Sequence, residues 1–508
     1  MNKNKIRNIV IVGGGTSGWM VASVFAKVLG CNNYTITLVE SEQIGTVGVG
    51  EATIPMINLF NGILGLNEDE FLRETNATFK LGIEFVNWGK IGKTYFHPFG
   101  SLGVDMEGIS FNHFWMRWKN SGGGLDYSKF SIETEAARAN KFIRTNSETG
   151  PAYMPKINYA FQFDASLYAN YLRRYSELRG VKRIEGKITQ VKQHADSGYI
   201  ESVILENGIV IEGDFFIDCS GFRGLLIEQT LKAGYEDWSQ WLPVNKAVAV
   251  PCDSAGPLLP FTRATAQEFG WQWRIPLQHR IGNGYVFCDK FLSVDEATET
   301  LLSRLDGKAT ASPRLLSFVT GVRKKCWIKN CVAVGLASGF LEPLESTSIH
   351  LVQVVIAKLL TMFPKDNISD FVVDRFNREM LHEYTDIKDF LIAHYKVSER
   401  EDTEFWRYVK HMNIPATLQE KLDTFRTRGD VMVKLDELFK EQSWFSVLVG
   451  QGLYPESYHP IADVVSDDDL RIRLTQIRTG IQNRLDMMPS HEEFIAKHCK
   501  SEHAMMRK

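Results

Sequence analysis

The chain has 508 residues, 44% of them hydrophobic, and its 58 Lys and Arg against 61 Asp and Glu give a formal net charge of −3. Such a chain can bury one large core or two fused ones, and its charge balance argues against nucleic acid as a partner. No apolar run is long enough to span a membrane, and the start MNKNK is unlike a signal peptide. Seven scattered cysteines without a Cys-x-x-Cys pair are typical of reduced thiols, so we expect a soluble cytoplasmic enzyme with no structural metal and no membrane partner.

A glycine-rich turn near the start of the chain is the clearest motif. The β-branched run Ile9–Val12 predicts a strand, and Trp19–Leu29 is apolar on one side, as a surface helix is. Between them Gly13, Gly15 and Gly18 stand at G-x-G-x-x-G spacing. This spacing lets a pyrophosphate approach bare backbone at the start of a helix.

An acidic residue follows this turn at the spacing that is typical of dinucleotide binding. A second predicted strand, Tyr34–Val39, ends in Glu40, about twenty residues past the last glycine, where a carboxylate can bind a ribose hydroxyl. A glycine-rich turn without a ligand is the alternative interpretation. Because the glycines follow the first strand, open a helix and precede a placed acid, we predict that an adenine dinucleotide binds here.

Two segments after this motif have both a functional and a structural interpretation. The loop Gly45–Pro55 holds three glycines in six residues, and it is either an exposed loop or one that lies against a cofactor. Lys80 begins a partly alternating stretch that reaches Trp88. A lysine in such surroundings either extends to solvent or takes part in catalysis.

Aromatic residues gather in two places further along the chain. Residues 89–155 have an irregular pattern that we interpret as an insertion covering a pocket, which His97 and Phe99 line unless they pack in the core. Trp271 and Trp273 alternate on one face of a predicted strand. Two such rings can form a rigid wall, and sheet packing is the alternative role.

The other elements continue both parts of the chain. Ala160–Leu178 predicts an amphipathic helix. A β-meander follows with predicted strands at Gly186–Gln193, Tyr199–Leu205 and Ile209–Ile217 and a hairpin turn at Asn207-Gly208. Asp214–Gly224 predicts a strand that returns to the dinucleotide sheet, and Cys331–Gly335 is a further predicted strand. The chain beyond residue 364 is mostly helical by pattern.

A polar turn precedes the apolar helix predicted at Ile349–Met362. Ser346 or Thr347 can cap this helix, and Glu345 comes just before it. The free amides at a helix start can bind an anion. This turn is therefore either an anion site or a capped helix start that binds nothing.

Taken together, these segments resemble the flavin-dependent halogenases of the tryptophan-halogenase family. Trp271-x-Trp273-x-Ile275-Pro276 matches that family's W-x-W-x-I-P signature, which separates it from flavin hydroxylases of the same fold. The likeness runs from Ile9 to about Gly452. The segments that carry it are Gly13–Gly18, Gly48–Pro55, Lys80, Trp271–Pro276 and Glu342–Ser348.

The resemblance implies an α/β fold. It has a Rossmann-like FAD-binding domain of the flavin monooxygenase type, with an inserted β-rich and C-terminal helical substrate module. The loop after Glu40 would lie against the flavin. We expect the FAD-binding domain at residues 1–88, 156–224 and 325–363, and the substrate-binding module at residues 89–155, 225–324 and 364–508.

The resemblance also implies a reaction. Reduced FAD (FADH2) and oxygen convert a bound halide ion, chloride or bromide, to hypohalous acid, which passes through a tunnel to an aromatic substrate. The family's tunnel lysine falls on Lys80, which forms a haloamine or hydrogen-bonds the hypohalous acid. The family's glutamate falls on Glu345, which would orient the oxidant and accept the proton lost from the ring. The family's halide-binding amides fall on Thr347 and Ser348.

The other site positions of the family are carried over residue by residue. No reductase domain and no second dinucleotide motif are present, so reduced flavin would come from a separate flavin reductase. Cofactor-binding positions would be Gly13, Gly15, Thr16, Ser17, Gly18, Glu40, Val49, Ala52, Ile188, Leu336 and Ile349, and substrate or tunnel positions would be His97, Phe99, Trp271, Trp273, Ile275, Pro276, Trp444 and Phe445.

Two features depart from the better-known tryptophan halogenases. Residue 348 is serine where many members have glycine, and Gln442–Gly452 has no match to their clamp for the ammonium and carboxylate of an amino acid. We therefore expect an indole or another electron-rich aromatic as the small-molecule partner, rather than free tryptophan. The alternatives are a flavin monooxygenase that hydroxylates its substrate directly and a non-catalytic flavin-binding protein. A homodimer and a monomer both stay open.

Overall fold

The computed structural model describes residues 5–43, 50–124, 126–144 and 157–502. Residues 45–49 of the predicted loop at Gly45–Pro55, which include Val49, lie outside this part. Contacts within the chain divide it into two compact units, and the division into a FAD-binding domain and a substrate module stays a prediction. Unit 1 comprises Met1–Ala77, Phe163–Gln240 and Phe318–Thr385, and unit 2 comprises Thr78–Gln162, Trp241–Ser317 and Asp386–Lys508.

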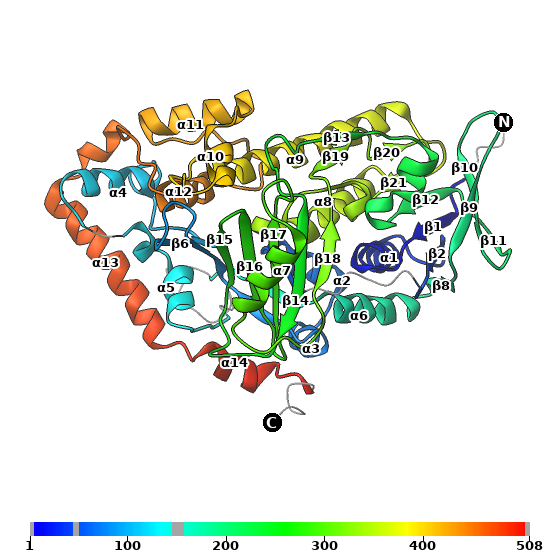
Figure 1. The fold of residues 1–508 in the computed structure, drawn as a ribbon, viewed down its shortest axis with the longest axis horizontal. Coiled ribbons are helices and arrows are strands. Elements are labelled where there is room, and N and C mark those ends of the chain that lie inside the picture. Colours follow the sequence, from blue (N-terminus) through cyan, green and yellow to red (C-terminus); the bar gives the residue numbers. More distant parts are fainter. Residues whose placement is uncertain (1–4, 44–49, 125, 145–156, 503–508) are drawn as a thin grey trace. The chain divides into compact units, whose positions relative to one another are not determined.

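Unit 1 is organised around a mostly parallel sheet (Figure 1). β1 (Asn8–Val12) pairs in parallel with β2 (Thr35–Glu40) and with β12 (Phe215–Asp218), so the predicted return of the chain to this sheet is confirmed. The strands are short buried apolar runs, as expected of a parallel sheet that is covered on both faces. The strand order is β20-β21-β12-β1-β2-β8, where β20 is Trp327–Ile328, β21 is Cys331–Ala333 and β8 is Lys182–Glu185.

Helix α1 (Thr16–Val28) follows the glycine turn and begins at Thr16 instead of Trp19. It packs against α6 (Ala165–Glu177) and α8 (Ser348–Thr361). The other elements of unit 1 are β3 (Gly50–Ala52), α2 (Met56–Leu64), α3 (Glu68–Glu74), β13 (Tyr235–Asp237), β19 (Gly321–Arg323) and β22 (Gly339–Phe340).

The helix predicted at Ala160–Leu178 is wrong in its first residues. Ala160–Asp164 is a strand, β7, and the helix begins at Ala165. Asp164 ends the strand because its carboxylate accepts hydrogen bonds from the amides of Ser166 and Leu167 at 3.0 and 3.2 Å and thereby caps α6.

The predicted β-meander is confirmed, except that its last strand divides. β9 (Ile188–Gln193), β10 (Ile200–Leu205) and β11 (Val210–Glu212) form an antiparallel sheet, and Gly208 has a φ of +83° in the hairpin turn. The strand predicted at Ile209–Ile217 ends at Glu212 because the chain then turns toward β1. The carboxylate of Asp214 marks this turn, since it accepts the amide of Asn8 at 2.8 Å.

Unit 2 contains a sheet of seven strands (Figure 1). Its strand β16 (Gly270–Pro276) lies between the antiparallel neighbours β15 (Thr262–Gln267) and β17 (Ile281–Phe287), and every residue of β16 is buried. β15 also pairs in parallel with β5 (Gly82–Val86). The order is β18-β14-β17-β16-β15-β5-β6, where β18 is Arg314–Ser317, β14 is Lys246–Cys252 and β6 is Thr94–Pro98.

The insertion predicted at residues 89–155 is more regular than its sequence pattern indicates. Its described residues form β6 and the helices α4 (Phe111–Asn120) and α5 (Ile132–Arg138). Each helix begins after a serine whose hydroxyl accepts a backbone amide, Ser110 for α4 and Ser131 for α5. Each cap starts a helix within the irregular sequence pattern. The aromatic residues Phe111, Phe114 and Trp115 lie on the buried face of α4.

The mostly helical pattern predicted beyond residue 364 is confirmed. Among the described residues, the helices fall short of the length and apolar character that a membrane span requires. The helices are α9 (Asp370–Lys396), α10 (Glu404–His411), α11 (Ala416–Arg428), α12 (Glu441–Gly450), α13 (Asp467–Asp486) and α14 (His491–His498), and α7 (Val294–Ser303) precedes them against β14 and β17.

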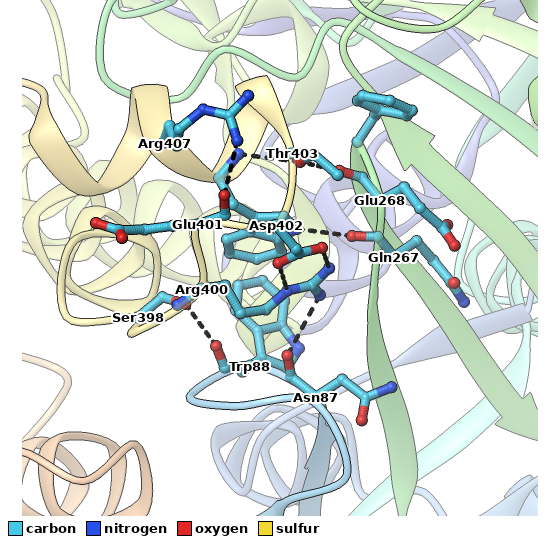
Figure 2. Close-up of polar contacts among 12 residues, drawn as sticks. Asn87, Trp88, Gln267, Glu268, Ser398, Arg400, Glu401, Asp402, Thr403 and Arg407 are labelled. Carbon is cyan, nitrogen blue, oxygen red and sulfur yellow. Dashed lines mark hydrogen bonds and ion pairs between the residues drawn. The ribbon is translucent and has the colours of Figure 1, made fainter.

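A polar cluster fastens the linker between α9 and α10 to the sheet of unit 2 (Figure 2). The side chain of Arg400 is 5% exposed and forms paired hydrogen bonds with Asp402 at 2.9 and 2.7 Å. It also donates to the carbonyl of Asn87 at 3.3 Å, and its guanidinium lies 4.4 Å from the ring centroid of Trp406. The indole of Trp406 in turn donates to the carbonyl of Gln267 at 2.7 Å.

Replacing Arg400 should therefore destabilise unit 2. We expect Arg400→Ala to lower the free energy of unfolding by roughly 2–3 kcal/mol, because a charge-assisted pair is lost and the carbonyl of Asn87 loses its donor. The matched variant is Arg407→Ala, since Arg407 is exposed and its described side-chain hydrogen bond is to the carbonyl of Glu401. Its expected effect is within about 0.5 kcal/mol. Equal urea midpoints for the two variants would contradict this role of Arg400.

Candidate functional site

The glycine turn of unit 1 brings β1 and α1 into close backbone contact. Gly13 has a φ of +111°, and a Cβ at this residue would lie 2.3 Å from the carbonyl oxygen of Cys219. A Cβ at Gly18 would lie 1.9 Å from the carbonyl oxygen of Gly13. A Cβ at Gly15, by contrast, would meet no atom within 4 Å, and Gly15 occupies the N-cap position of α1, which has no side-chain cap. The first amides of α1 are therefore open to a phosphate-sized group.

The carboxylate of Glu40 lies directly beside this turn. A Cβ at Gly14 would be 1.5 Å from one of its oxygens, which explains a glycine between the motif positions. The other oxygen forms an ion pair with Arg183, and Arg173 lies 3.8 Å away. These cations hold the carboxylate at the end of β2, where a ribose next to the turn would meet it.

The other predicted cofactor positions of unit 1 have different surroundings. Leu336 belongs to a turn that touches α1, because a Cβ at Gly335 would lie 2.3 Å from the hydroxyl oxygen of Ser17. Ile188 instead packs in the hydrophobic cluster of the sheet, together with Val12 and Val39. Two further positions have structural surroundings of their own: Ala52 is buried in β3, and the hydroxyl of Thr16 donates to the carbonyl of Ala165 at 3.4 Å.

The start of α8 differs from the capped helix that the sequence predicts. The helix begins at Ser348, and Thr347 occupies the capping position without a side-chain capping bond. Ser346 instead has a left-handed backbone, with φ +60°. The Thr347 side chain is completely buried, and within the described part of the chain its hydroxyl has no hydrogen-bond partner. Of the two residues that the sequence offers as a cap, Thr347 occupies the capping position but its hydroxyl makes no capping hydrogen bond, and Ser346 lies one residue before it.

This helix start has the properties of an anion site. The first hydrogen bond within α8 runs from the amide of Leu351 to the carbonyl of Thr347 at 2.9 Å, so the amides of Ser348 and Ile349 have no acceptor inside the helix. The positive end of the helix dipole lies at the same place. Glu345, 1% exposed, ends the short turn that precedes it.

In unit 2 the side chain of Lys80 is completely buried at the end of strand β4 (Thr78–Lys80). Its Nζ lies 5.0 Å from the ring centroid of Phe99. The amide of Phe99 donates to the carbonyl of Leu81 at 3.0 Å, and the hydroxyl of Thr78 donates to the carbonyl of Pro276 at 2.7 Å. The fold therefore brings together the segments of Lys80, Phe99 and the W-x-W-x-I-P strand.

The two tryptophans of β16 lie on one face of the strand, as predicted. Trp271 and Trp273 are buried, with ring centroids 6.2 Å apart. Trp273 packs against Gly284 of β17, where a Cβ would come within 2.1 Å of the indole. Ile275 points the same way. These contacts are those of sheet packing, and a wall beside a tunnel stays a prediction.

His97 and Trp444 belong to one aromatic cluster, which also contains Phe390 and Phe439. The ring of Phe390 is stacked on Phe439 at 3.9 Å, lies 5.8 Å from His97 and meets Trp444 edge-on at 4.9 Å. The indole nitrogen of Trp444 is buried and has no hydrogen-bond partner in the described chain. Phe390 and Phe439 are the members that the sequence did not indicate, because aromatic residues on helices are as frequent in plain cores.

Phe445 lies in a different group of rings. Its closest described ring partner is Tyr127, at 4.6 Å, and Trp115 and Phe425 also contact it. Adjacent residues of a helix point about 100° apart, so Trp444 and Phe445 could not both face the His97 cluster. The structure therefore separates two residues that the sequence analysis placed in one set.

A buried acid, Glu133, adjoins the segment of Phe99. A Cβ at Gly100 would lie 2.0 Å from its carboxylate, which accepts the amide of Asn158 at 3.0 Å and the hydroxyl of Ser131 at 3.3 Å. Burial raises the pKa of Glu133 to about 7. No motif pointed to this residue, because a glutamate near a helix start is usually a solvated first-turn acid.

The raised pKa predicts a pH-dependent contribution to stability. The neutral carboxyl is the form that the folded state favours, so its contribution is complete below the ordinary pKa of 4.5 and is lost as the pH rises through about 7. Glu133→Gln removes this titration. We expect the difference in unfolding free energy between the two proteins to change by roughly 3 kcal/mol across that range, measured by urea unfolding at a series of pH values. Parallel profiles would contradict it.

Comparison with known proteins gives a consistent result. The family model for tryptophan halogenases matches residues 8–467. Tryptophan 7-halogenase RebH of Lentzea aerocolonigenes is 34% identical over 533 residues, which cover 97% of this chain and 98% of that protein. A flavin-dependent halogenase from Xanthomonas campestris has a TM-score of 0.95 at 45% identity, over 98% of this chain and 99% of that one. BrvH, a flavin-dependent halogenase from Brevundimonas sp. BAL3, has a TM-score of 0.93 at 40% identity, over 97% and 99%. These likenesses confirm the predicted fold class, and the chain therefore belongs to the tryptophan halogenase family of flavin-dependent enzymes.

Proposed function

We propose that this enzyme halogenates an electron-rich aromatic, with an indole as the preferred class. Reduced FAD, oxygen and a halide are the co-substrates, and hypohalous acid reaches Lys80 through an internal tunnel. The overall change is balanced: FADH2, O2, a halide with one proton and the ring C–H give FAD, the ring C–halogen bond and two waters. The activities named for the relatives support halogenation as the reaction class.

The burial of Lys80 is the observation that carries this proposal. A lysine without any exposed surface is rare, because taking an ammonium group out of water costs free energy unless the group is well partnered. Its Nζ lies beside an aromatic ring, at the end of a strand whose neighbours are fixed by hydrogen bonds. A haloamine on Nζ, or a hydrogen bond from Nζ to hypohalous acid, would each hold the halogen at a defined position.

The residues around the glycine turn fit FAD. The open backbone at Gly15 and the helix start suit a diphosphate, and the carboxylate of Glu40 suits a ribose hydroxyl. When bound there, reduced FAD supplies the electrons that activate oxygen. The other predicted cofactor positions in the described chain, Thr16, Ser17, Ala52, Ile188, Leu336 and Ile349, belong to the same proposal.

The start of α8 fits a halide. The buried hydroxyl of Thr347 has no hydrogen-bond partner among the described residues. The backbone amides of the first turn of α8, which begins at Ser348, point toward the N-terminal end of the helix, where Thr347 lies. Glu345, buried immediately before this turn, would orient the oxidant and accept the proton that the ring loses. Among the described residues the Thr347 hydroxyl has no hydrogen-bond partner, and Glu345 is held away from water.

The residues near the proposed substrate site favour an uncharged aromatic. The segment Gln442–Gly452 contains no charged side chain, and the cluster around His97 consists of aromatic rings. The ammonium of Lys421 lies 4.9 Å from the ring centroid of Trp444, but it is already paired with the buried carboxylate of Glu437, so an amino-acid carboxylate would have to compete for it. We also propose that a separate reductase supplies FADH2, and a homodimer stays an open alternative to a monomer.

Substitution of Lys80 tests the proposed function. With indole, bromide, oxygen and FADH2, we expect Lys80→Ala to form brominated indole at least about 100-fold more slowly, because a displaced reacting group costs this much, while FAD still binds. Lys90→Ala is the matched control, since the side chain of Lys90 is 59% exposed. Full activity of Lys80→Ala would refute the role of this lysine. Hydroxylated instead of brominated indole in the mass spectrum would favour direct monooxygenation.

Substitution of Thr347 tests the halide site. We expect Thr347→Val to raise the KM for bromide about tenfold or more, because one hydrogen bond to an anion is lost while the side-chain volume is kept. Thr361→Val makes the same change at the far end of α8, where the hydroxyl donates to the carbonyl of Ala357, and should leave the KM for bromide unchanged. Equal KM values in all three proteins would exclude Thr347 from the halide site.

A further inference from the structure

The residue before Lys80 is the centre of an aromatic cluster in unit 2. The ring of Phe79 is stacked on Phe142 at 3.9 Å and meets Phe494 edge-on at 5.5 Å. Successive residues of a strand point to opposite faces, so this cluster holds β4 from the face opposite to Lys80. Helix α14, which carries Phe494, is thus part of the support of the proposed catalytic strand.

A histidine of the same helix binds the backbone of β4. The Nε2 atom of His491 accepts the amide of Phe79 at 3.3 Å, and its Nδ1 atom lies 2.7 Å from the carbonyl oxygen of Leu258. An amide can only donate and a carbonyl can only accept, so the proton of the ring must be on Nδ1. His491 is completely buried, and this neutral form satisfies both of its nitrogens.

The position of His491 is fixed from two further directions. α14 begins with a capping box in which Ser490 and Glu493 exchange hydrogen bonds, the amide of Glu493 donating to the Ser490 hydroxyl at 3.2 Å and the amide of Ser490 donating to the Glu493 carboxylate at 2.9 Å. The carboxylate of Glu492 accepts the amide of Leu258 at 2.9 Å. Leu258 is therefore held at both its amide and its carbonyl by neighbouring residues of one helix turn.

The electrostatic surroundings keep the ring in the form that the geometry needs. Burial lowers the pKa of His491 to about 4, so the imidazole is neutral near pH 7. A protonated ring would present an N–H to the amide of Phe79, and the two donors would repel each other.

We infer that His491 is a positioning residue for halogenation: its imidazole fixes the backbone of β4 at Phe79 and so holds the amine of Lys80 where the halogen is transferred. This inference rests on the function proposed above for Lys80. His491 does not touch the reacting atoms in this scheme. Replacing His491 should therefore lower the yield of brominated indole per FADH2 oxidised, and should leave the binding and oxidation of the flavin unchanged.

Two substitutions separate positioning from packing. His491→Phe keeps a ring of similar size against Phe79 but removes the acceptor. His491→Gln loses the ring, but its side-chain oxygen can accept the amide of Phe79. His498→Phe is the matched control, since it makes the same chemical change on α14, where the ring of His498 packs on Phe494.

The assay compares two products of the same oxidant. With FADH2, oxygen, bromide and indole, one measures brominated indole per FADH2 oxidised, and free hypobromous acid trapped by a β-diketone. In His491→Phe we expect the yield of brominated indole to fall about 10- to 100-fold, trapped hypobromous acid to rise, and the KM for indole to stay the same. His491→Gln should recover part of the yield, and His498→Phe should behave like the unmodified enzyme.

Three results would overturn the inference. These are an unchanged yield in His491→Phe, a yield in His491→Gln no better than in His491→Phe, and an equal loss in His498→Phe. A packing role predicts that phenylalanine is tolerated better than glutamine, which is the reverse of the expected order. Lys80→Ala, measured in parallel, distinguishes a failure of the proposed function from a failure of the role inferred for His491. Full yield in Lys80→Ala would refute the proposed function itself, whereas loss in Lys80→Ala with full yield in His491→Phe would refute only the role of His491.

Discussion

The complete burial of one amine, on a strand of three residues, is the constraint on which the proposed chemistry depends. A group that would otherwise be hydrated stays in place only if the backbone on both sides of it is fixed. In unit 2 this is achieved by contacts of the neighbours of Lys80. The hydroxyl of Thr78 binds the end of β16, and the carbonyl of Leu81 binds the amide of Phe99. These contacts of its neighbours fix the backbone on either side of the proposed catalytic lysine.

Local patterns were sufficient to predict the parts of the fold that follow from backbone geometry. The glycine turn after β1 could be read from spacing, because Gly13 and Gly18 stand where a Cβ would collide with backbone. The boundary of α6 could not be read in this way. Ala160–Leu178 has helical periodicity throughout, but Asp164 caps the helix from within, and the preceding residues pair with β4. A single capping residue thus outweighed the periodicity of its neighbours.

The candidate site was predictable only where a motif is short and continuous. The segments of Lys80, Thr347 and Trp271–Pro276 stood out because their residue types and order are specific. Phe390, Glu133 and His491 did not, since each gains its surroundings from chain that is distant in sequence. The hydroxyl of Thr347 is instructive in another way. Its residue type indicated a cap, and only the three-dimensional turn shows that this hydroxyl makes no capping bond.

The separation of Phe79 and His491 by 412 residues has a consequence for assembly. Contacts of such high sequence separation form late, because the entropy of closing a long loop is lost before the contact stabilises the chain. During synthesis the chain emerges from its N-terminus, so β4 leaves the ribosome long before the imidazole that holds it. A nascent chain can therefore contain the lysine without containing its support. On the role proposed for His491, the amine of Lys80 gains its support only when most of unit 2 has been made.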